Sequence, residues 1–273
     1  MKARLKFSKT GSMRFIGHLD VMRYFQKAFR RAGIAVSYSQ GFSPHQLMSF
    51  ASPLGIGLSS DAEYLDVVLE NEAQAENFLV RINEAMNDEI TVKDFTILTK
   101  EAKTSMAVLA ACDYLITVKP DKESFLTDTV KRTKALERFM ARESVEIVKK
   151  TKRSEKLVDI RENIYCLTDR QEILEEFTGI SYGELSLDMA EYIPVLYCQL
   201  TAGSVVNIKP ELVLEALCRQ EGEEYNWLSY QIHRLEMYGD VTAKKGEVHT
   251  LHGEVPCKLL PLSDFGKGEG VQQ

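Results

Sequence analysis

Residues 14–50 read RFIGHLDVMRYFQKAFRRAGIAVSYSQGFSPHQLMSF, and this stretch decides the fold of the N-terminal part of the chain. Apolar residues recur in it at helical spacing and predict an amphipathic helix over residues 19–32, which Gly33 ends. The apolar positions of the predicted buried face are Val21, Phe25, Ala28, Phe29 and Ala32. A Gly/Ser/Pro turn over 40–45 follows the helix and carries a phenylalanine and a histidine.

The segments around this helix predict the order β-α-β-(β)-β-α-β, in which the bracketed strand is short. Residues 2–8 alternate charged and apolar side chains, as a half-buried strand does. The other predicted strands are 34–39, 46–50, 64–70 and 92–98, with a second helix over 72–86 and a second Gly/Ser loop over 53–64. This order indicates an α+β, ferredoxin-like sandwich of helices on a mostly antiparallel sheet.

The element order then restarts after a linker at 99–111. The predicted elements are a strand at 112–120, a helix at 122–142, a hairpin of 145–150 and 156–161 around the turn 151–155, strands at 163–167, 184–189, 195–200 and 230–238, and a helix from Pro210 to 218. We therefore expect two ferredoxin-like α/β sandwich units in tandem. The expected domains are 1–100 and 111–240, with an extension over 241–273 that is disordered from about residue 261.

Composition narrows the class of protein. The chain is 44% hydrophobic and 27% charged, as soluble globular chains are. No apolar run approaches the roughly 18 residues of a membrane span, and residues 1–9 lack the apolar core of a signal peptide, so we expect a cytoplasmic protein. The five cysteines lie far apart, which predicts buried, reduced thiols and neither a metal site nor a cofactor.

Positive charge is concentrated in two blocks. Residues 1–60 hold nine Lys and Arg against one acid, a net charge of +8, whereas the whole chain carries −6. Residues 131–161 hold eleven Lys and Arg against five acids, a net charge of +6. Such segregation indicates an anionic partner, and RNA is the partner that we expect.

The candidate nucleic-acid or anion ligands lie in these blocks. They are Arg14, His18, Arg23, Lys27, Arg30, Arg31, Tyr38, Ser39, Phe42, His45, Lys149, Lys150, Lys152 and Arg153. Cations would follow the phosphates, hydroxyl groups would donate to them, and Phe42 would stack on a base. The alternatives are an ordinary solvated helix face, a phenylalanine that plugs the edge of the domain, and lysines that protect an edge strand.

His18 and His45 leave several interpretations open. They are the candidates for an acid–base pair beside a phosphodiester. Alternatively, one of them ligates a metal with Asp20 or Glu63, contacts a ligand without catalysis, or simply caps the helix or holds the loop.

Four stretches resemble a family of bacterial proteins. They are 14–20 (RFIGHLD), 30–33 (RRAG), 38–45 (YSQGFSPH) and 60–64 (SDAEY). The family is that of the radical-SAM-associated, or radical-SAM-linked, proteins, which carry a domain of unknown function. The specific part of the resemblance covers about residues 2–70, and a looser likeness extends to about residue 238.

The resemblance implies a partner protein rather than a radical SAM enzyme, because the chain lacks the C-x-x-x-C-x-x-C motif that holds the iron–sulfur cluster. Our first hypothesis is therefore a non-catalytic accessory protein of a radical SAM enzyme that binds RNA, either tRNA or rRNA. The alternatives are an RNA-processing or RNA-modifying enzyme that uses His18 and His45, and a protein-interaction module without nucleic acid.

Overall fold

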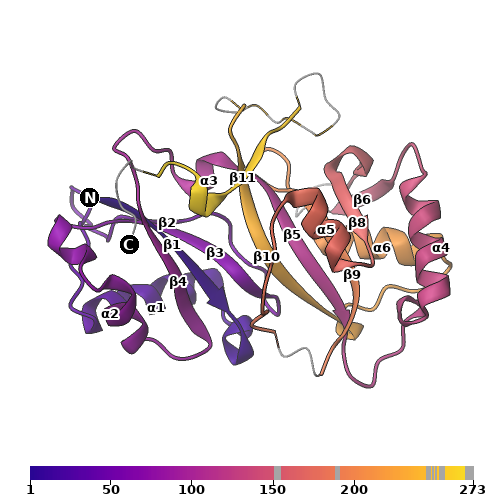
Figure 1. The fold of residues 1–273 in the computed structure, drawn as a ribbon, viewed down its shortest axis with the longest axis horizontal. Coiled ribbons are helices and arrows are strands. Elements are labelled where there is room, and N and C mark those ends of the chain that lie inside the picture. The colour runs from indigo at the N-terminus through magenta and orange to yellow at the C-terminus, as the bar shows by residue number, and fades with distance from the viewer. Residues whose placement is uncertain are drawn as a thin grey trace. The chain divides into compact units, whose positions relative to one another are not determined.

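The computed structural model describes residues 1–150, 155–187, 191–243, 247, 249, 251 and 256–267. It is a mixed α+β structure with mostly antiparallel strand pairing, which confirms the predicted fold class at that level. The chain divides into two compact units (Figure 1). The first comprises Met1–Ala110, Glu236–Val241 and Leu259–Gln273, and the second comprises Ala111–Leu235 and Thr242–Lys258.

In the first unit a central strand lies between two antiparallel neighbours. The strands are β1 (Lys2–Lys9) at the centre, β4 (Ile90–Ile97) and β3 (Ser59–Val68) beside it, and the short β2 (Met48–Phe50), which pairs with β3. The helices α1 (His18–Arg31) and α2 (Phe78–Glu84) lie on one side of these strands (Figure 1). The predicted strand at 2–8 and the predicted helix at 19–32 are confirmed, with the helix beginning one residue earlier.

The core of this unit is aromatic. Phe25 of α1 meets Phe7 of β1 at a ring-centroid distance of 4.8 Å and Phe50 at 5.8 Å, in edge-to-face arrangements. The predicted buried face of α1 is confirmed for all its members except Ala32, which is half-buried. The helix ends because Gly33 adopts a left-handed φ of 63°.

Three predicted elements of this unit differ from the structure. The predicted strand at 34–39 is reduced to the isolated bridges Val36–Leu69 and Tyr38–Gln46. The predicted helix at 72–86 is interrupted by Asn77 in the left-handed region, which separates a 3-10 turn at Glu72–Ala75 from α2. The end of the predicted loop 53–64 belongs to β3, because its polar side chains find partners there, as in the 2.6 Å ion pair of Asp61 with Lys93.

A buried ion pair draws distant segments together in the first unit. Arg4 Nε lies 2.7 Å from Asp66 Oδ1, and Asp66 also accepts a hydrogen bond from the backbone of Ser105 at the start of α3 (Ser105–Val108). Arg4 also donates to the carbonyl oxygens of Leu262, Phe265 and Lys103. Residues 259–264 form β11 (Leu259–Pro261) and a 3-10 turn. This corrects the predicted disorder from about residue 261 for the residues that are described. The last predicted residues, 268–273, lie outside the described part of the chain.

The second unit has its own antiparallel strands in the order β5-β9-β8. They are β5 (Leu109–Val118, whose first two residues belong to the first unit), β9 (Ile193–Thr201) and β8 (Ile164–Thr168), and β10 (Tyr230–Asp240) begins in this unit. The helices α4 (Thr129–Met140) and α6 (Pro210–Gln220) lie side by side (Figure 1). The hairpin of β6 (Glu146–Lys150) and β7 (Glu155–Asp159) forms a separate two-stranded sheet, as predicted.

Two predictions for the second unit need correction. The helix predicted from 122 begins at 129, because the Asp128 side chain caps it by accepting from the backbone of Val130 and Lys131. Residues 184–187 are not a strand, and the rest of that predicted strand lies outside the described residues. The helix α5 (Gln171–Thr178) is an element that the sequence reasoning missed.

All five cysteines are free and buried, which confirms the expectation of structural thiols. Burial raises the pKa of the Cys166 thiol to about 12, so this group stays protonated. No helix among the described residues is long and apolar enough to span a bilayer.

Candidate nucleic-acid interface

Three cations project from the outer face of α1. Arg23, Lys27 and Arg30 are exposed. Arg23 lies 3.3 Å from Asp20, but both side chains are mostly solvated, so this pair contributes little. Arg30 donates to the carbonyl oxygen of Gln26, and no side-chain partner of Lys27 is found among the described residues. The three side chains are therefore available to an anionic ligand.

Arg31 has a different role. Its guanidinium donates two hydrogen bonds, of 3.1 and 2.6 Å, to the carbonyl oxygen of Ala85 at the C-terminus of α2. It also lies over the ring of Tyr24, 6.0 Å from the centroid. A cation at this end of a helix is favourable, so Arg31 joins the two helices.

Most cations of β1 are used inside the fold. Arg4 is buried in its pair with Asp66, and Lys6 Nζ lies 2.6 Å from Glu236 Oε2. Lys9 is also buried, and its ammonium donates to the carbonyl oxygen of Ile16 at 3.0 Å. The net charge of +8 counted over residues 1–60 thus overstates the positive charge that this segment presents to solvent.

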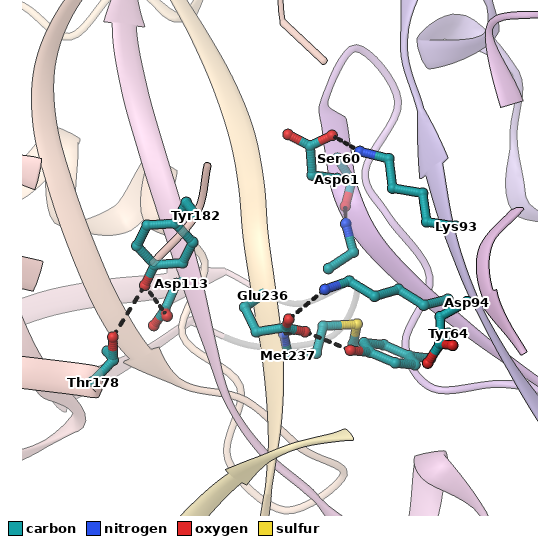
Figure 2. A network of polar contacts seen from close by, with 12 residues as sticks. Ser60, Asp61, Tyr64, Lys93, Asp94, Asp113, Thr178, Tyr182, Glu236 and Met237 are labelled. Atoms are coloured by element: carbon teal, nitrogen blue, oxygen red, sulfur yellow. Dashed lines mark hydrogen bonds and ion pairs between the residues drawn. The ribbon is translucent and has the colours of Figure 1, made fainter. Parts of the chain in front are cut away.

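Glu236 also anchors a second polar contact. Tyr64 donates a 2.6 Å hydrogen bond to Glu236 Oε1 (Figure 2). Burial, and then the neighbouring Glu236 carboxylate, raise the pKa of Tyr64 well above its usual value. In the second unit, Tyr182 donates a 2.5 Å bond to Asp113, which is fully buried (Figure 2). We interpret these contacts as structural because buried polar groups require such partners.

Exposed apolar side chains lie beside the α1 cations. Leu19 is four residues before Arg23 on the same face of the helix, and Phe15 ends the 3-10 turn that precedes it. The loop at 53–58 joins them, because the backbone N–H of Gly57 donates to the carbonyl oxygen of Arg14 at 2.8 Å. Phe15 and Leu19 are each 60% exposed and Ile56 is 68% exposed.

We call this region the α1 surface. Its members are Arg14, Phe15, Leu19, Arg23, Lys27, Arg30 and Ile56. The Arg14 guanidinium lies 4.8 Å from the centroid of the Phe15 ring, a cation–π contact that holds the ring in place. Sequence reasoning missed Phe15, Leu19 and Ile56. The signal for Leu19 was present, because it falls outside the buried stripe of the helix.

The predicted loop projects into solvent. Phe42 is fully exposed and does not plug the edge of the domain. His45 Nδ1 lies 2.9 Å from Ser39 Oγ, and the backbone groups of Ser39 and His45 also bond at 2.8 Å. Tyr38 is half-exposed at the base of the loop. His45 therefore closes the loop and presents Phe42.

His18 belongs to a different environment. It lines a small cavity of about 20 Å³ together with Lys9, Glu63 and Phe50, whose ring it meets edge-on at 5.1 Å. Glu63 is buried because it lies on the same strand face as the core residue Leu65. A cavity of this size holds one water molecule. His18, Glu63 and Lys9 thus line the same small space.

The structure does not bring His18 and His45 together. Neither ring hydrogen-bonds to the other, since His18 contacts Phe50 and His45 contacts Ser39. Among the described residues, no group of three or more His, Cys, Asp and Glu is arranged to hold a metal ion. Of the two acids considered as co-ligands, Asp20 pairs with Arg23, and Glu63 lines the cavity beside His18.

Two arginines of the second basic block form ion pairs within the fold. Arg132 pairs with Asp169 at 3.3 Å, and Arg138 pairs with Glu221 at 2.5 Å. Lys149 and Lys150 occupy register positions opposite Lys156 and Glu155 in the β6–β7 hairpin. The remaining candidates, Lys152 and Arg153, lie outside the described residues.

Together these features define an α+β protein whose first unit presents a basic and apolar helix surface and an exposed aromatic loop. The chain belongs to a family of uncharacterized proteins conserved in bacteria, DUF2344, whose model matches residues 2–210. This range begins with β1 and ends at Pro210, the first residue of α6. No curated protein matches the chain.

Proposed function

We propose that the protein binds single-stranded RNA through the α1 surface. The observation that carries the proposal is the direct proximity of exposed apolar side chains to exposed cations that no buried acid neutralises. Exposed aromatic rings stack on unpaired bases, and Lys and Arg follow the backbone. Phe15 is the stacking platform, and Arg23, Lys27 and Arg30 contact phosphates.

The dimensions of α1 support this assignment. Arg23 and Arg30 are seven residues apart, which places them about 10 Å apart along the helix axis. A cation row of that length meets more than one phosphate of a strand, because phosphates follow one another every few ångströms. Phe42 adds a second exposed ring on the loop that His45 closes.

We extend the proposal to the tandem ferredoxin-like architecture. In the first unit, the order β4-β1-β3 with β2 on β3 is compatible with a βαββαβ unit. In the second unit, the strand order is β5-β9-β8, and the start of β10 lies beside β5. This arrangement is also compatible with a βαββαβ unit, into which the β6–β7 hairpin is inserted. RNA-binding modules of this architecture are a precedent by analogy only.

We also propose that the protein is an accessory of a radical SAM enzyme and acts in the cytoplasm. The resemblance in residues 14–64 supports the first statement, and five free, buried thiols support the second. Coexpression with a radical SAM protein from the same bacterium, followed by size-exclusion chromatography, tests the association. Separate elution of the two proteins at micromolar concentration contradicts it.

The RNA proposal is tested with a labelled single-stranded oligonucleotide. We expect the triple substitution R23A/K27A/R30A to weaken binding at least tenfold in fluorescence anisotropy, because it removes about three phosphate contacts. The matched control is Lys100→Ala, which removes an exposed cation of the same unit outside the α1 surface. Equal binding by the triple variant and the control places the interaction elsewhere. Absence of binding at low salt contradicts the proposal and favours a protein-interaction module.

The cavity beside His18 favours a second candidate function, RNA processing or modification at that residue. His18 exchanges a proton with the bound strand, and Lys9 and Glu63 position the cavity water behind it. We expect His18→Gln to abolish a change in oligonucleotide mass that the wild-type chain produces, while RNA affinity changes less than threefold. An unchanged oligonucleotide mass after prolonged incubation with the wild-type protein rules this function out for that RNA.

A further inference from the structure

A second exposed apolar group lies in the second unit, where three strand ends meet. Ile193 opens β9 and is paired in register with Val118, the last residue of β5. The next residue, Lys119, donates its backbone N–H to the carbonyl oxygen of Ser229 at 2.9 Å. Ser229 ends the 3-10 turn that Trp227 begins, and β10 follows directly. Trp227, Leu228 and Ile193 are thereby gathered at one end of the sheet.

All three side chains are exposed to solvent. Trp227 is 67% exposed, Ile193 is 52% exposed and Leu228 is 48% exposed. Isolated exposed apolar residues are ordinary, but a group that includes a tryptophan indicates an interaction surface. We call Trp227, Leu228 and Ile193 the Trp227 surface.

The turn that carries Trp227 is fixed. The Asn226 side chain accepts a 3.0 Å hydrogen bond from the backbone of Leu228, and Ser229 is buried. Tyr225 stacks on Tyr230 at a centroid distance of 6.0 Å and so anchors the segment from both sides. A partner that binds here therefore meets a preorganised ring and loses little conformational entropy in ordering it.

Acidic residues flank the members of this surface along the chain. The exposed charged residues within four positions of Lys119, Ile193 or Trp227 are Asp121, Lys122, Glu123, Glu191, Glu223 and Glu224. With the half-exposed Lys119 they sum to five acids against two bases, a net charge of −3. This rim has the opposite sign to the cations of the α1 surface, so it repels a nucleic-acid backbone and attracts a basic partner.

We propose that the Trp227 surface docks a basic amphipathic helix of a partner protein. Apolar residues at i and i+3 or i+4 of that helix cover Trp227, Leu228 and Ile193, and its flanking Lys and Arg side chains meet the acidic rim. This site is independent of the proposed RNA function, which resides in the first unit. It gives the protein a second face for a second class of ligand.

Trp227 is the single tryptophan of the chain, so its emission reports on this site alone. The probe is a 14-residue peptide in which Leu and Lys follow a helical pattern, titrated into the full-length protein. A peptide of the same pattern with Glu in place of Lys is the control. We expect a saturable blue shift of the emission with the Lys peptide and no shift with the Glu peptide. An unchanged emission with the Lys peptide, or equal shifts with both, overturns the proposal.

Variants distinguish specific binding at the Trp227 surface from nonspecific electrostatic attraction of a basic peptide to an acidic protein. We expect Trp227→Ala to weaken binding of the fluorescently labelled Lys peptide at least tenfold, whereas Val205→Ala, an exposed apolar residue of the same unit, leaves it unchanged. The variant E223K/E224K retains the tryptophan and reports on the rim. It weakens the blue shift, and an unaltered shift overturns the role of the acidic residues. Quenching of Trp227 by single-stranded RNA at moderate salt also overturns the proposal, because the site would then accept nucleic acid.

Discussion

At the scale of single residues, the sign of a side chain predicts less than its burial does. Arg4, Lys6 and Lys9 contribute to the same positive count as Arg23 and Lys27, yet the first three are bound within the fold and the other two face solvent. A buried cation needs a partner because desolvation is costly, whereas an exposed one keeps its hydration. Only the second kind is available to a ligand.

The buried pair of Arg4 and Asp66 supports the first prediction at this scale. We expect Asp66→Asn to lower the free energy of unfolding by about 3–5 kcal/mol, because it leaves the Arg4 guanidinium buried without a counter-charge. Urea denaturation followed by circular dichroism measures the loss. The control is Asp20→Asn, which breaks the solvated pair with Arg23 and costs less than about 1 kcal/mol. Equal costs for the two variants would contradict the assigned role of burial.

At the scale of elements, α1 shows how far a periodic pattern reaches. Its buried face and its end at Gly33 follow directly from the spacing of apolar residues and from a glycine that can adopt positive φ. The α1 surface has no such pattern, because Ile56 arrives from a loop that a backbone hydrogen bond to Arg14 holds in place. The α1 surface could therefore be recognised only from the tertiary structure.

The helix end gives the second prediction. We expect Gly33→Ala to destabilise the protein by about 1 kcal/mol, since an alanine at a φ of 63° is strained. A Cβ atom at this position would lie 3.9 Å from Arg81 Nη2, so the cost comes from the backbone and not from a clash. Gly55→Ala is the matched control, because its φ is not in the left-handed region and its Cβ meets only Leu58 at 3.5 Å. Thermal unfolding that ranks the two variants in the opposite order would disprove this account.

At the scale of the whole molecule, the exposed charges of the two units differ in sign. The chain carries −6 overall, yet the first unit presents cations on α1 and the second presents acids around Trp227. The two surfaces suit ligands of opposite charge. The two proposed ligands, an RNA and a basic protein segment, therefore belong to different units of the chain.

The number of available cations sets the third prediction, the salt dependence of RNA binding. Three phosphate contacts predict a slope of about −2 in a plot of log binding constant against log salt concentration, by the single-strand coefficient of about 0.7 per contact. If all of the net +8 of residues 1–60 acted at the surface, the slope would be about −6. Binding isotherms between about 50 and 200 mM salt distinguish these values. A slope near −6 would show that cations outside the α1 surface take part.

The sequence alone determined the α+β class, the buried face of α1, the β6–β7 hairpin and the free thiols, because each follows from local periodicity, turn chemistry or composition. It did not reveal the strand character of Ser59–Glu63, whose polar side chains are accommodated by partners such as Lys93. Nor did it reveal which cations are bound within the fold, that the loop carrying Ile56 is held beside Arg14, or that His18 lies beside Glu63 while His45 closes a separate loop. Those features depend on contacts between residues far apart in the chain. Only the tertiary structure decides them, because burial and pairing are properties of the folded neighbourhood and not of the local sequence.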